Sequence, residues 1–230
     1  MPLRVVGRRV LRRRGSRKFA PERYWETRHQ THQASLKAVG HVKLTDRQSA
    51  EQYEIKRSLL IAMIRRHCPE TTGRSLLDAG CGIGLLTGAF VEQGFDVLGV
   101  DFSETAIERA RAGGIGAKFL VSKLAGLNIE QQFDVITAVD VLLHVVDRRE
   151  WHATLDAFRR HLKPEGVLIV LDWLDARVRR VQPHLRARSQ RRYARALARA
   201  GLRIVEHERF RLEHEGSTKD LLAIRHIQTM

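Results

Sequence analysis

The stretch that decides the fold is Leu76-Leu77-Asp78-Ala79-Gly80-Cys81-Gly82-Ile83-Gly84. Its apolar start is typical of a buried strand, and its glycines let the backbone turn sharply and approach a ligand before the next helix. In an open α/β sheet, ligands bind at the carboxyl ends of the strands, where this loop lies. Asp101 ends the next expected strand, where its carboxylate can accept hydrogen bonds from both hydroxyls of a ribose. The loop and Asp101 together predict a nucleoside site.

The spacing of the glycines and the acid before them narrow the choice of nucleoside. A dinucleotide fingerprint is G-x-G-x-x-G, with the pyrophosphate on the helix N-terminus, whereas Gly80, Gly82 and Gly84 give G-x-G-x-G. Asp78 would repel a pyrophosphate but suits a ligand that carries an ammonium group. A Walker-type lysine is missing from the loop, which disfavours ATP. S-adenosylmethionine has an ammonium, a cationic sulfonium and no phosphate.

The chain around this loop alternates strands and helices. The expected strands are 75–78, 96–101, 118–121, 133–139, 166–172, 202–210 and 219–227. The expected helices are 85–93, one that Ser103 caps, 149–161 and 183–200. This order predicts an α/β fold with a doubly wound, seven-stranded sheet, mostly parallel. The last two strands, joined near Gly216 without a helix between them, imply one antiparallel strand.

Three segments follow from composition and periodicity. Residues 1–20 are expected to be a basic flexible tail, residues 21–72 a helical cap or lid, and residues 73–230 an S-adenosylmethionine-binding domain. Apolar residues recur at nearly helical spacing from Tyr53 to Ile64, and Pro69 with Gly73 ends that segment.

From about Ser75 to Asp172, and through the closing pair of strands, the sequence resembles the class I S-adenosylmethionine-dependent methyltransferases, in the branch similar to ubiquinone and menaquinone biosynthesis enzymes. Phe133-Asp134-Val135-Ile136 with Asp140-Val141-Leu142-Leu143-His144-Val145 is similar to that branch's fourth-strand motif, and Leu162-Lys163-Pro164-Glu165-Gly166 to its turn into strand five. The resemblance implies a Rossmann-like fold and methyl transfer from S-adenosylmethionine. The glycine loop would hold the methionine part, Asp101 the ribose, and Phe102 would lie beside the adenine.

The resemblance assigns twelve residues to the cofactor: Trp25, Arg28, Asp78, Gly80, Cys81, Gly82, Gly84, Asp101, Phe102, Ser122, Leu124 and Asp140. The sequence departs from the branch after the third strand. An Asp usually reads the adenine amino group there, but Ser122-Lys123-Leu124 occupies the stretch, so Ser122 or the backbone would read adenine. Arg28 is expected to pair with the cofactor carboxylate.

His144 is the expected catalytic residue. Methyl transfer is chiefly a positioning problem, and a hydroxyl acceptor also benefits from a general base. The alternative is that His144 only packs or caps its turn. Tyr24, Tyr53 and Trp173 are the expected substrate contacts, with Lys56 serving the same lid as Tyr53. Trp25 and Tyr53 could equally pack the cap onto the sheet, and Trp173 could be core.

No metal site is expected, because His29, His32 and His41 are irregularly spaced. Cys68 and Cys81 cannot staple a domain of 230 residues, which favours the reducing cytoplasm. The sequence shows no apolar run of spanning length and no secretory signal. A peripheral position on an anionic membrane, with a lipid-soluble phenol as acceptor, is a variant of this expectation.

The chain has 41 Lys and Arg against 26 Asp and Glu, a net charge of +15. Eighteen of the basic residues lie in the acid-free segments 1–19 and 177–203, so the remainder is near neutral. Arg188, Arg191, Arg192, Arg195 and Arg199 are expected to form one exposed helix face, which is either a solvated face or a docking surface for an anionic membrane or RNA.

The favoured function is S-adenosylmethionine-dependent methylation of a small molecule, on an oxygen nucleophile such as a phenol or hydroxyl. The alternative is an RNA methyltransferase that binds phosphates through the basic segments. Against base methylation, Asp140-Val-Leu-Leu lacks an Asn/Asp-Pro-Pro-aromatic motif, and no Cys lies near the fourth or fifth strand. A third hypothesis is a non-enzymatic binder of an anionic partner that uses the tail alone.

Overall fold

The computed structural model describes residues 19–32, 35–40, 43–175, 177, 179–214 and 216–228. The expected basic tail therefore lies almost wholly outside the described residues, as does His41. The elements in chain order are α1 (Pro21–Thr31), η1 (Leu36–Ala38), α2 (Asp46–His67), β1 (Ser75–Ala79), α3 (Leu85–Glu92), β2 (Asp96–Asp101), α4 (Glu104–Ala112), β3 (Lys118–Val121), η2 (Leu124–Gly126), β4 (Phe133–Val139), α5 (Arg148–His161), β5 (Leu162–Asp172), β6 (Arg179–Gln182), β7 (Leu185–Ala187), α6 (Gln190–Arg199), β8 (Leu202–Leu212) and β9 (Ser217–His226).

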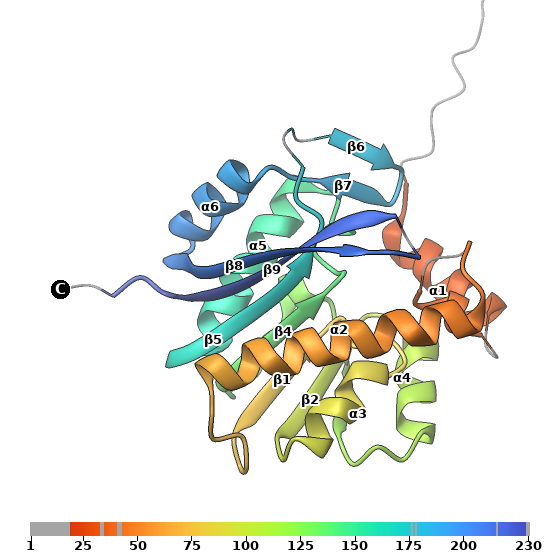
Figure 1. Ribbon diagram of the computed structural model, residues 1–230, viewed down its shortest axis with the longest axis horizontal. Coiled ribbons are helices and arrows are strands. Elements are labelled where there is room, and N and C mark those ends of the chain that lie inside the picture. Colours follow the sequence, from red (N-terminus) through yellow and green to blue (C-terminus); the bar gives the residue numbers. More distant parts are fainter. Residues whose placement is uncertain are drawn as a thin grey trace, which may run out of the picture.

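Seven strands form one twisted sheet in the order β3-β2-β1-β4-β5-β9-β8 (Figure 1). The pairs among β3, β2, β1, β4 and β5 are parallel, and β9 runs antiparallel to both β5 and β8. This arrangement confirms the predicted seven-stranded, doubly wound sheet with one antiparallel strand. Because β9 runs the other way, its first residues reach the edge where the parallel strands end.

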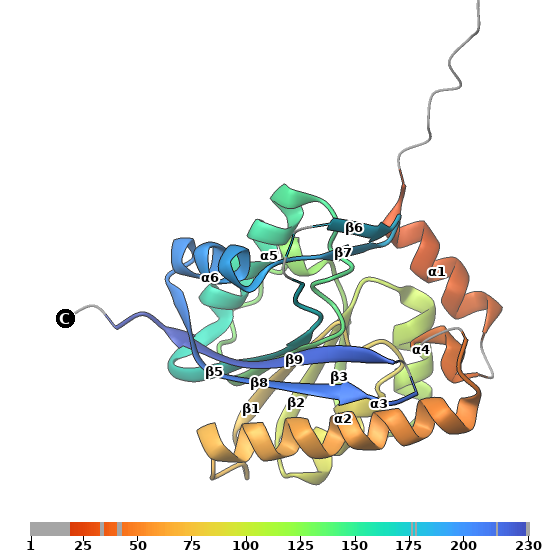
Figure 2. The ribbon, with the colours of Figure 1, turned by 45° about the horizontal axis from the view of Figure 1, so that its top comes forward.

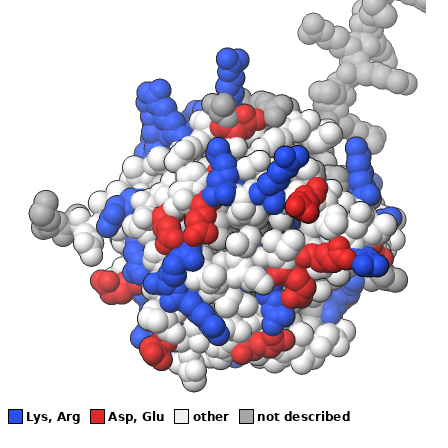
Figure 3. Space-filling view, in the orientation of Figure 1, with Lys and Arg blue, Asp and Glu red and all other residues white. Residues whose placement is uncertain are grey.

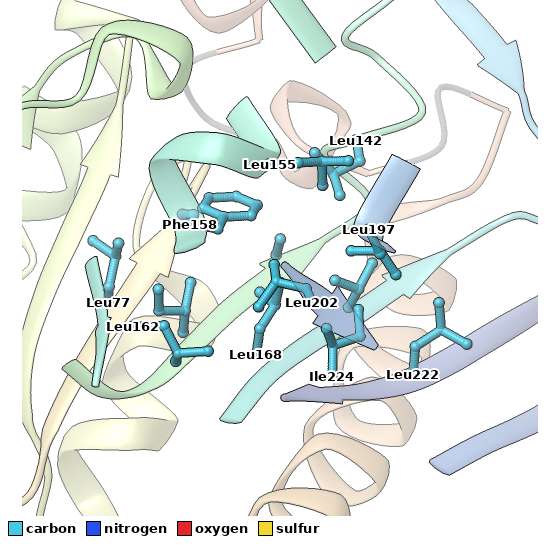
Figure 4. Packing of buried hydrophobic residues seen from close by; sticks show 14 of the residues in the cluster. Leu77, Leu142, Leu155, Phe158, Leu162, Leu168, Leu197, Leu202, Leu222 and Ile224 are labelled. Carbon is cyan, nitrogen blue, oxygen red and sulfur yellow. The ribbon is translucent and has the colours of Figure 1, made fainter. Parts of the chain in front are cut away.

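Helices cover both faces of the sheet and bury two apolar cores (Figure 2). On one face, α5 and α6 pack through Trp151, Phe158 and Leu197, which belong to the cluster shown in part in Figure 4. On the other face, α2 and α3 contribute Leu60, Met63, Ile64 and Phe90 to the second core. The expected cap segment therefore supplies, through α2, a helix that covers one face of the sheet.

Side-chain caps set most of the helix starts. Thr45 and Gln48 form a capping box at the start of α2. Ser103 accepts from the Ala106 amide at the start of α4, as the sequence predicts. Asp147 caps α5 in the same way. None of the described helices combines the length and apolarity needed to cross a bilayer.

The helix expected over residues 183–200 is wrong in its first third. The helix α6 begins at Gln190 behind the cap residue Ser189, and the preceding residues form the hairpin β6–β7. Pro183 falls in the turn of that hairpin, between β6 and β7. Proline is favoured in such a turn. The many arginines around Pro183 leave no apolar periodicity in the sequence that would distinguish a helix from a strand.

For Arg188 in that segment, the expectation of an exposed helix face is wrong. Its side chain is buried, at 3% exposure, rather than part of an exposed face. Its guanidinium donates to the Leu142 carbonyl at 2.8 Å and to the Val145 carbonyl, and it lies 4.3 Å from the Trp151 ring centroid. Arg188 therefore ties the hairpin to the loop after β4. Exposed arginines do remain on α6: Arg191, Arg195 and Arg199.

Two other boundaries differ from expectation. Residues expected to be helical over 21–70 form α1 and α2, with the short η1 between them. The strand expected to start at Gly166 begins at Leu162, because Leu162 pairs with Phe133 before a register shift. The turn expected at residues 162–166 is therefore an irregular start of β5.

Replacing Arg188 tests its role in holding the hairpin. We expect Arg188→Met to lower the free energy of unfolding by about 2–4 kcal/mol, because two carbonyl groups lose their charged donor. Arg191→Met, on the exposed side of α6, is the matched control and should change it by less than about 0.5 kcal/mol. Urea denaturation measures both. Equal stability of the two variants would contradict the assignment.

Candidate active site

A cavity of about 550 Å³ lies at the carboxyl edge of the sheet. Its floor is the loop after β1 and the ends of β2 and β4. The walls include residues of α1, α2, α5, the segment after β3, the hairpin β6–β7 and the start of β9. Residues from segments far apart in the sequence meet there. This is the position that the sequence predicts for a ligand site.

The glycine loop is tied to the neighbouring strand by backbone hydrogen bonds. The amides of Gly80 and Cys81 both donate to the Val100 carbonyl, at 2.7 and 3.1 Å. Gly80 has a φ of +77°, and a Cβ there would overlap Val141. Only glycine fits this position without strain, so the backbone itself forms the cavity floor.

Asp78 and Asp101 are two buried carboxylates beside this loop. Asp78 accepts from the hydroxyls of Thr87 and Thr137 at 2.7 and 3.0 Å. Asp101 accepts from the amides of Gly82 and Ser103 at 3.0 and 2.9 Å. Burial raises the pKa of Asp78 to about 6 and also raises the pKa of Asp101. Within the described residues neither carboxylate has an ion-pair partner, so both are suited to a cationic or hydroxyl-bearing ligand.

Most of the expected cofactor residues line the cavity: Trp25, Arg28, Asp78, Gly80, Cys81, Gly82, Asp101, Phe102, Leu124 and Asp140. Two do not. Gly84 is the N-cap residue of α3, with a φ of +83°. The Ser122 hydroxyl donates to the Lys123 carbonyl at 3.3 Å and lies outside the cavity lining. The reading of adenine by Ser122 stays a prediction.

Arg28 lines the cavity, but much of its guanidinium is engaged within the cap. Its Nε donates to the Lys37 carbonyl at 2.8 Å, and its Nη2 donates to the Gly40 carbonyl. The group also lies 4.8 Å from the Trp25 ring centroid. Arg28 thus holds η1 against α1. Its expected pairing with a cofactor carboxylate stays a prediction.

The helix α1 is fastened over the nucleoside end of the cavity. Glu26 accepts from the hydroxyls of Ser103, at 2.7 Å, and Thr105, at the start of α4. Glu22 pairs with Lys123 at 2.6 Å. These contacts place α1 beside Asp101 at the edge of the cavity.

His144 lies in an aromatic cluster at the other end of the cavity. Its Nδ1 is 2.8 Å from the His184 carbonyl oxygen, so Nδ1 carries the proton and Nε2 keeps a lone pair. Its ring lies 4.7 Å from Trp25, and the His184 ring stacks on Tyr24 at 4.5 Å. Burial lowers the pKa of His144 to about 4, so the ring is neutral at pH 7.

Two lysines form ion pairs with Asp140 in the same cavity. Lys56 from α2 reaches one carboxylate oxygen at 2.7 Å, and Lys219 from β9 reaches the other. Burial alone would raise the pKa of Asp140, but the two ammonium groups outweigh it and hold that pKa well below its usual range. Asp140 also has a φ of +55°, a strained left-handed conformation of the kind that clusters at functional sites.

The expected substrate contacts divide in the structure. Tyr24 and Tyr53 line the cavity, whereas Trp173 does not and its amide donates to Asp172 at 2.7 Å. Sequence reasoning missed His184 and Lys219, which both line the cavity. The sequence contained one indication for Lys219. It opens the expected antiparallel strand, whose first residues must lie at the ligand edge of the sheet. His184 carried none, because its segment was taken for a helix.

Comparison with known proteins places this site in a family context. Residues 50–207 match the family model described as a methyltransferase domain. The ubiquinone biosynthesis O-methyltransferase of Rickettsia bellii is 29% identical over 120 residues, which are 50% of this chain and 49% of that protein. The protein of the same name from Idiomarina loihiensis is 34% identical over 112 residues, which are 46% of this chain and 45% of that protein. The chain thus spans about half the length of these curated relatives.

Solved structures share the fold. The structure of a Burkholderia thailandensis 1,6-didemethyltoxoflavin-N1-methyltransferase, with bound 1,6-didemethyltoxoflavin and S-adenosylhomocysteine, has a TM-score of 0.64 and 19% sequence identity. The match covers 91% of this chain and 92% of that chain. At this identity the likeness concerns the fold alone.

The raised pKa of Asp78 predicts a specific pH dependence of stability. An aspartate whose pKa is about 6 when folded and near 4 when unfolded binds its proton more tightly in the folded state. Stability is then full below pH 4, falls as the pH rises to about 6, and is level above. We expect Asp78→Asn to gain roughly 2–3 kcal/mol relative to wild type between pH 4 and pH 7.

Urea denaturation across this pH range measures the difference between the two proteins. Asp96→Asn, at the exposed start of β2, is the control and should run parallel to wild type. Parallel curves for Asp78→Asn would contradict the environment assigned to this carboxylate.

Proposed function

The chain belongs to the methyltransferase-domain family, and from this premise we propose that it transfers a methyl group from S-adenosylmethionine to an oxygen atom of a small molecule. The observation that carries the proposal is the glycine loop beside two buried carboxylates that have no ion-pair partner in the described part of the chain. A ligand with an ammonium and a ribose diol supplies what both carboxylates need. Its sulfonium would provide the electrophilic methyl group.

Different residues would contact different parts of the cofactor. Asp78 faces the end of the loop where an ammonium group would offset the burial of its charge. Asp101 would accept hydrogen bonds from the ribose hydroxyls while it keeps the amides of Gly82 and Ser103. Phe102 and Leu124 line the wall where an adenine ring would lie. The chain itself thus positions the cofactor, and positioning is the largest contribution to a methyl transfer.

His144 is the proposed general base. The His184 carbonyl fixes the proton on Nδ1, so Nε2 is the atom that can take a proton from an acceptor hydroxyl. Burial keeps the ring neutral at pH 7, so Nε2 is unprotonated there, although the lowered pKa makes it a weaker base than a solvated imidazole. The packing of Trp25 and His184 around the ring holds it in one orientation.

The lining of the site favours a small acceptor. The helix α1 and the hairpin β6–β7 both contribute to the wall of the cavity, and their rings leave an aromatic surface around His144. Such an aromatic surface suits a flat phenol or hydroxylated ring. The names of the O-methyltransferase relatives support oxygen as the methylated atom.

Radiolabelled S-adenosylmethionine with cell extract tests the acceptor class. We expect label to move into organic solvent or low-molecular-weight metabolites, and boiled protein is the control. Label that is acid-insoluble and sensitive to RNase would instead establish the alternative, in which the exposed arginines of α6 bind RNA. Incorporation of no label with any extract fraction would contradict methyl transfer.

Replacing His144 tests its role as base. We expect His144→Ala to lower kcat by about 10²–10⁴-fold, the usual contribution of a general base. The Kd for S-adenosylhomocysteine should stay within threefold, because the ring lies at the other end of the cavity. His152→Ala, on α5 and outside the cavity lining, is the control. Near-full turnover of His144→Ala would show that His144 only packs its turn.

A further inference from the structure

Glu150 is a carboxylate of the cavity lining to which the proposed function gives no role. It lies in the first turn of α5, and it is half-buried. Its backbone amide donates to Asp147 at 3.0 Å, but its carboxylate forms no hydrogen bond and no ion pair with any described residue. Burial and the charge of Glu22 raise the pKa of Glu150. A partly desolvated carboxylate of this kind is stabilised by a ligand that brings a hydrogen-bond donor.

Glu150 lies at the end of the cavity where the base of the cofactor would lie. It interacts with the charge of Lys123, the residue between β3 and η2, and α5 packs against η2. Phe102, which follows β2, and Leu124, which begins η2, line the same part of the cavity. With the ribose held by Asp101 at the end of β2, the base would extend over β3, the next strand at about 4.8 Å, toward η2 and α5.

The other polar groups at this end already have partners. The Lys123 ammonium bonds to the Glu22 carboxylate at 2.6 Å. Thr154, one turn beyond Glu150 on α5, donates to the Glu150 carbonyl at 2.9 Å. Ser122, which was expected to read adenine, donates to the Lys123 carbonyl at 3.3 Å and lies outside the cavity lining. The Glu150 carboxylate is therefore the charged group at this end that has no hydrogen-bonding partner in the described part of the chain.

The chemistry of a carboxylate limits what can face it. An ionised carboxylate accepts hydrogen bonds and donates none, so the facing group must be a donor. Adenine carries such a donor in its exocyclic amino group. A hydrogen bond to an ionised acceptor is roughly twice as strong as one between neutral groups, and it gains further strength in a partly desolvated wall.

We propose that the Glu150 carboxylate accepts a hydrogen bond from the amino group of adenine, so that Glu150 makes the cofactor site specific for adenine among the purines. Ser122 then takes no part in reading the base. The inference rests on the proposed function for the cofactor alone, and its test needs neither an acceptor nor turnover.

The test compares two probes that differ only at this amino group. They are S-adenosylhomocysteine and its analogue in which purine replaces adenine, so that a hydrogen stands where the amino group was. Calorimetry measures the binding of each. We expect the wild type to prefer S-adenosylhomocysteine by about 10–100-fold, the usual worth of a hydrogen bond to a charged group. Equal affinities would overturn the inference and leave the proposed function standing, whereas no binding of either probe would contradict both.

Two variants should lower this preference by different amounts. Glu150→Gln keeps an acceptor of the same shape without the charge, so the preference should fall to an intermediate value. Glu150→Ala removes the acceptor, so the two probes should bind within about threefold of each other. A purely structural role would weaken both probes by the same factor and leave the preference as in the wild type. That result would overturn the proposal, and because the preference is a ratio within each variant, a general loss of affinity does not imitate the expected one.

Two further variants identify the group that reads the base. Glu22→Gln should weaken both probes alike, because α1 loses its ion pair to Lys123, and should keep the wild-type preference. Ser122→Ala should keep it as well. Loss of the preference in either variant, with its retention in Glu150→Ala, would assign the adenine contact to that residue and overturn the role of Glu150.

The matched control for the loss of a negative charge is Asp156→Asn. Asp156 lies on α5, as Glu150 does, but it is exposed and outside the cavity lining. Because solvent and salt screen a charge at such a position, the preference should stay within about twofold of wild type. A loss comparable to that of Glu150→Gln would show a general effect of charge and overturn the inference.

Discussion

The attachment of the glycine loop to β2 is the constraint on which the rest of the site depends. The Val100 carbonyl accepts from two successive amides, and the Asp101 carboxylate accepts from Gly82. These bonds hold the loop close enough that any side chain at Gly80 would collide with Val141. They also keep Asp78 and Asp101 buried, with carboxylates that, among the described residues, accept hydrogen bonds from hydroxyl and amide donors alone. A cationic, diol-bearing ligand completes that arrangement.

Around this rigid floor, the walls include two elements that lie far apart in the sequence. The helix α1 is held by Glu26 on the start of α4, and the hairpin β6–β7 is held by Arg188 on the loop after β4. Both attachments converge on His144, whose ring contacts Trp25 from α1 and the His184 carbonyl from the hairpin. The orientation of the proposed base therefore depends on contacts between segments about 40 to 120 residues apart.

Figure 3 shows that acidic and basic side chains are interspersed on one face of the molecule, so the net charge of the chain does not produce a continuous basic surface there.

The sequence predicted what is encoded locally. Strand–helix alternation, the glycine spacing and the acid that ends β2 were enough to place the sheet and the loop that lines the cavity, and the expected family is confirmed by the match over residues 50–207. Non-local packing was out of reach. In the sequence, Arg188 is one of many arginines in a basic segment and nothing distinguishes it from its neighbours. The fold shows that it is buried against two carbonyl groups. Lys219 and Lys56 are 163 positions apart and meet because an antiparallel strand returns to the ligand edge.

Calorimetric titration of S-adenosylhomocysteine into the wild type and Asp101→Asn tests the central claim most directly. The account predicts saturable binding of one molecule per chain to the wild type. It predicts at least tenfold weaker binding to Asp101→Asn, because a charged acceptor at the ribose is lost. Equal affinity of the two proteins, or no binding by the wild type, would contradict the claim that this loop and this carboxylate hold the cofactor.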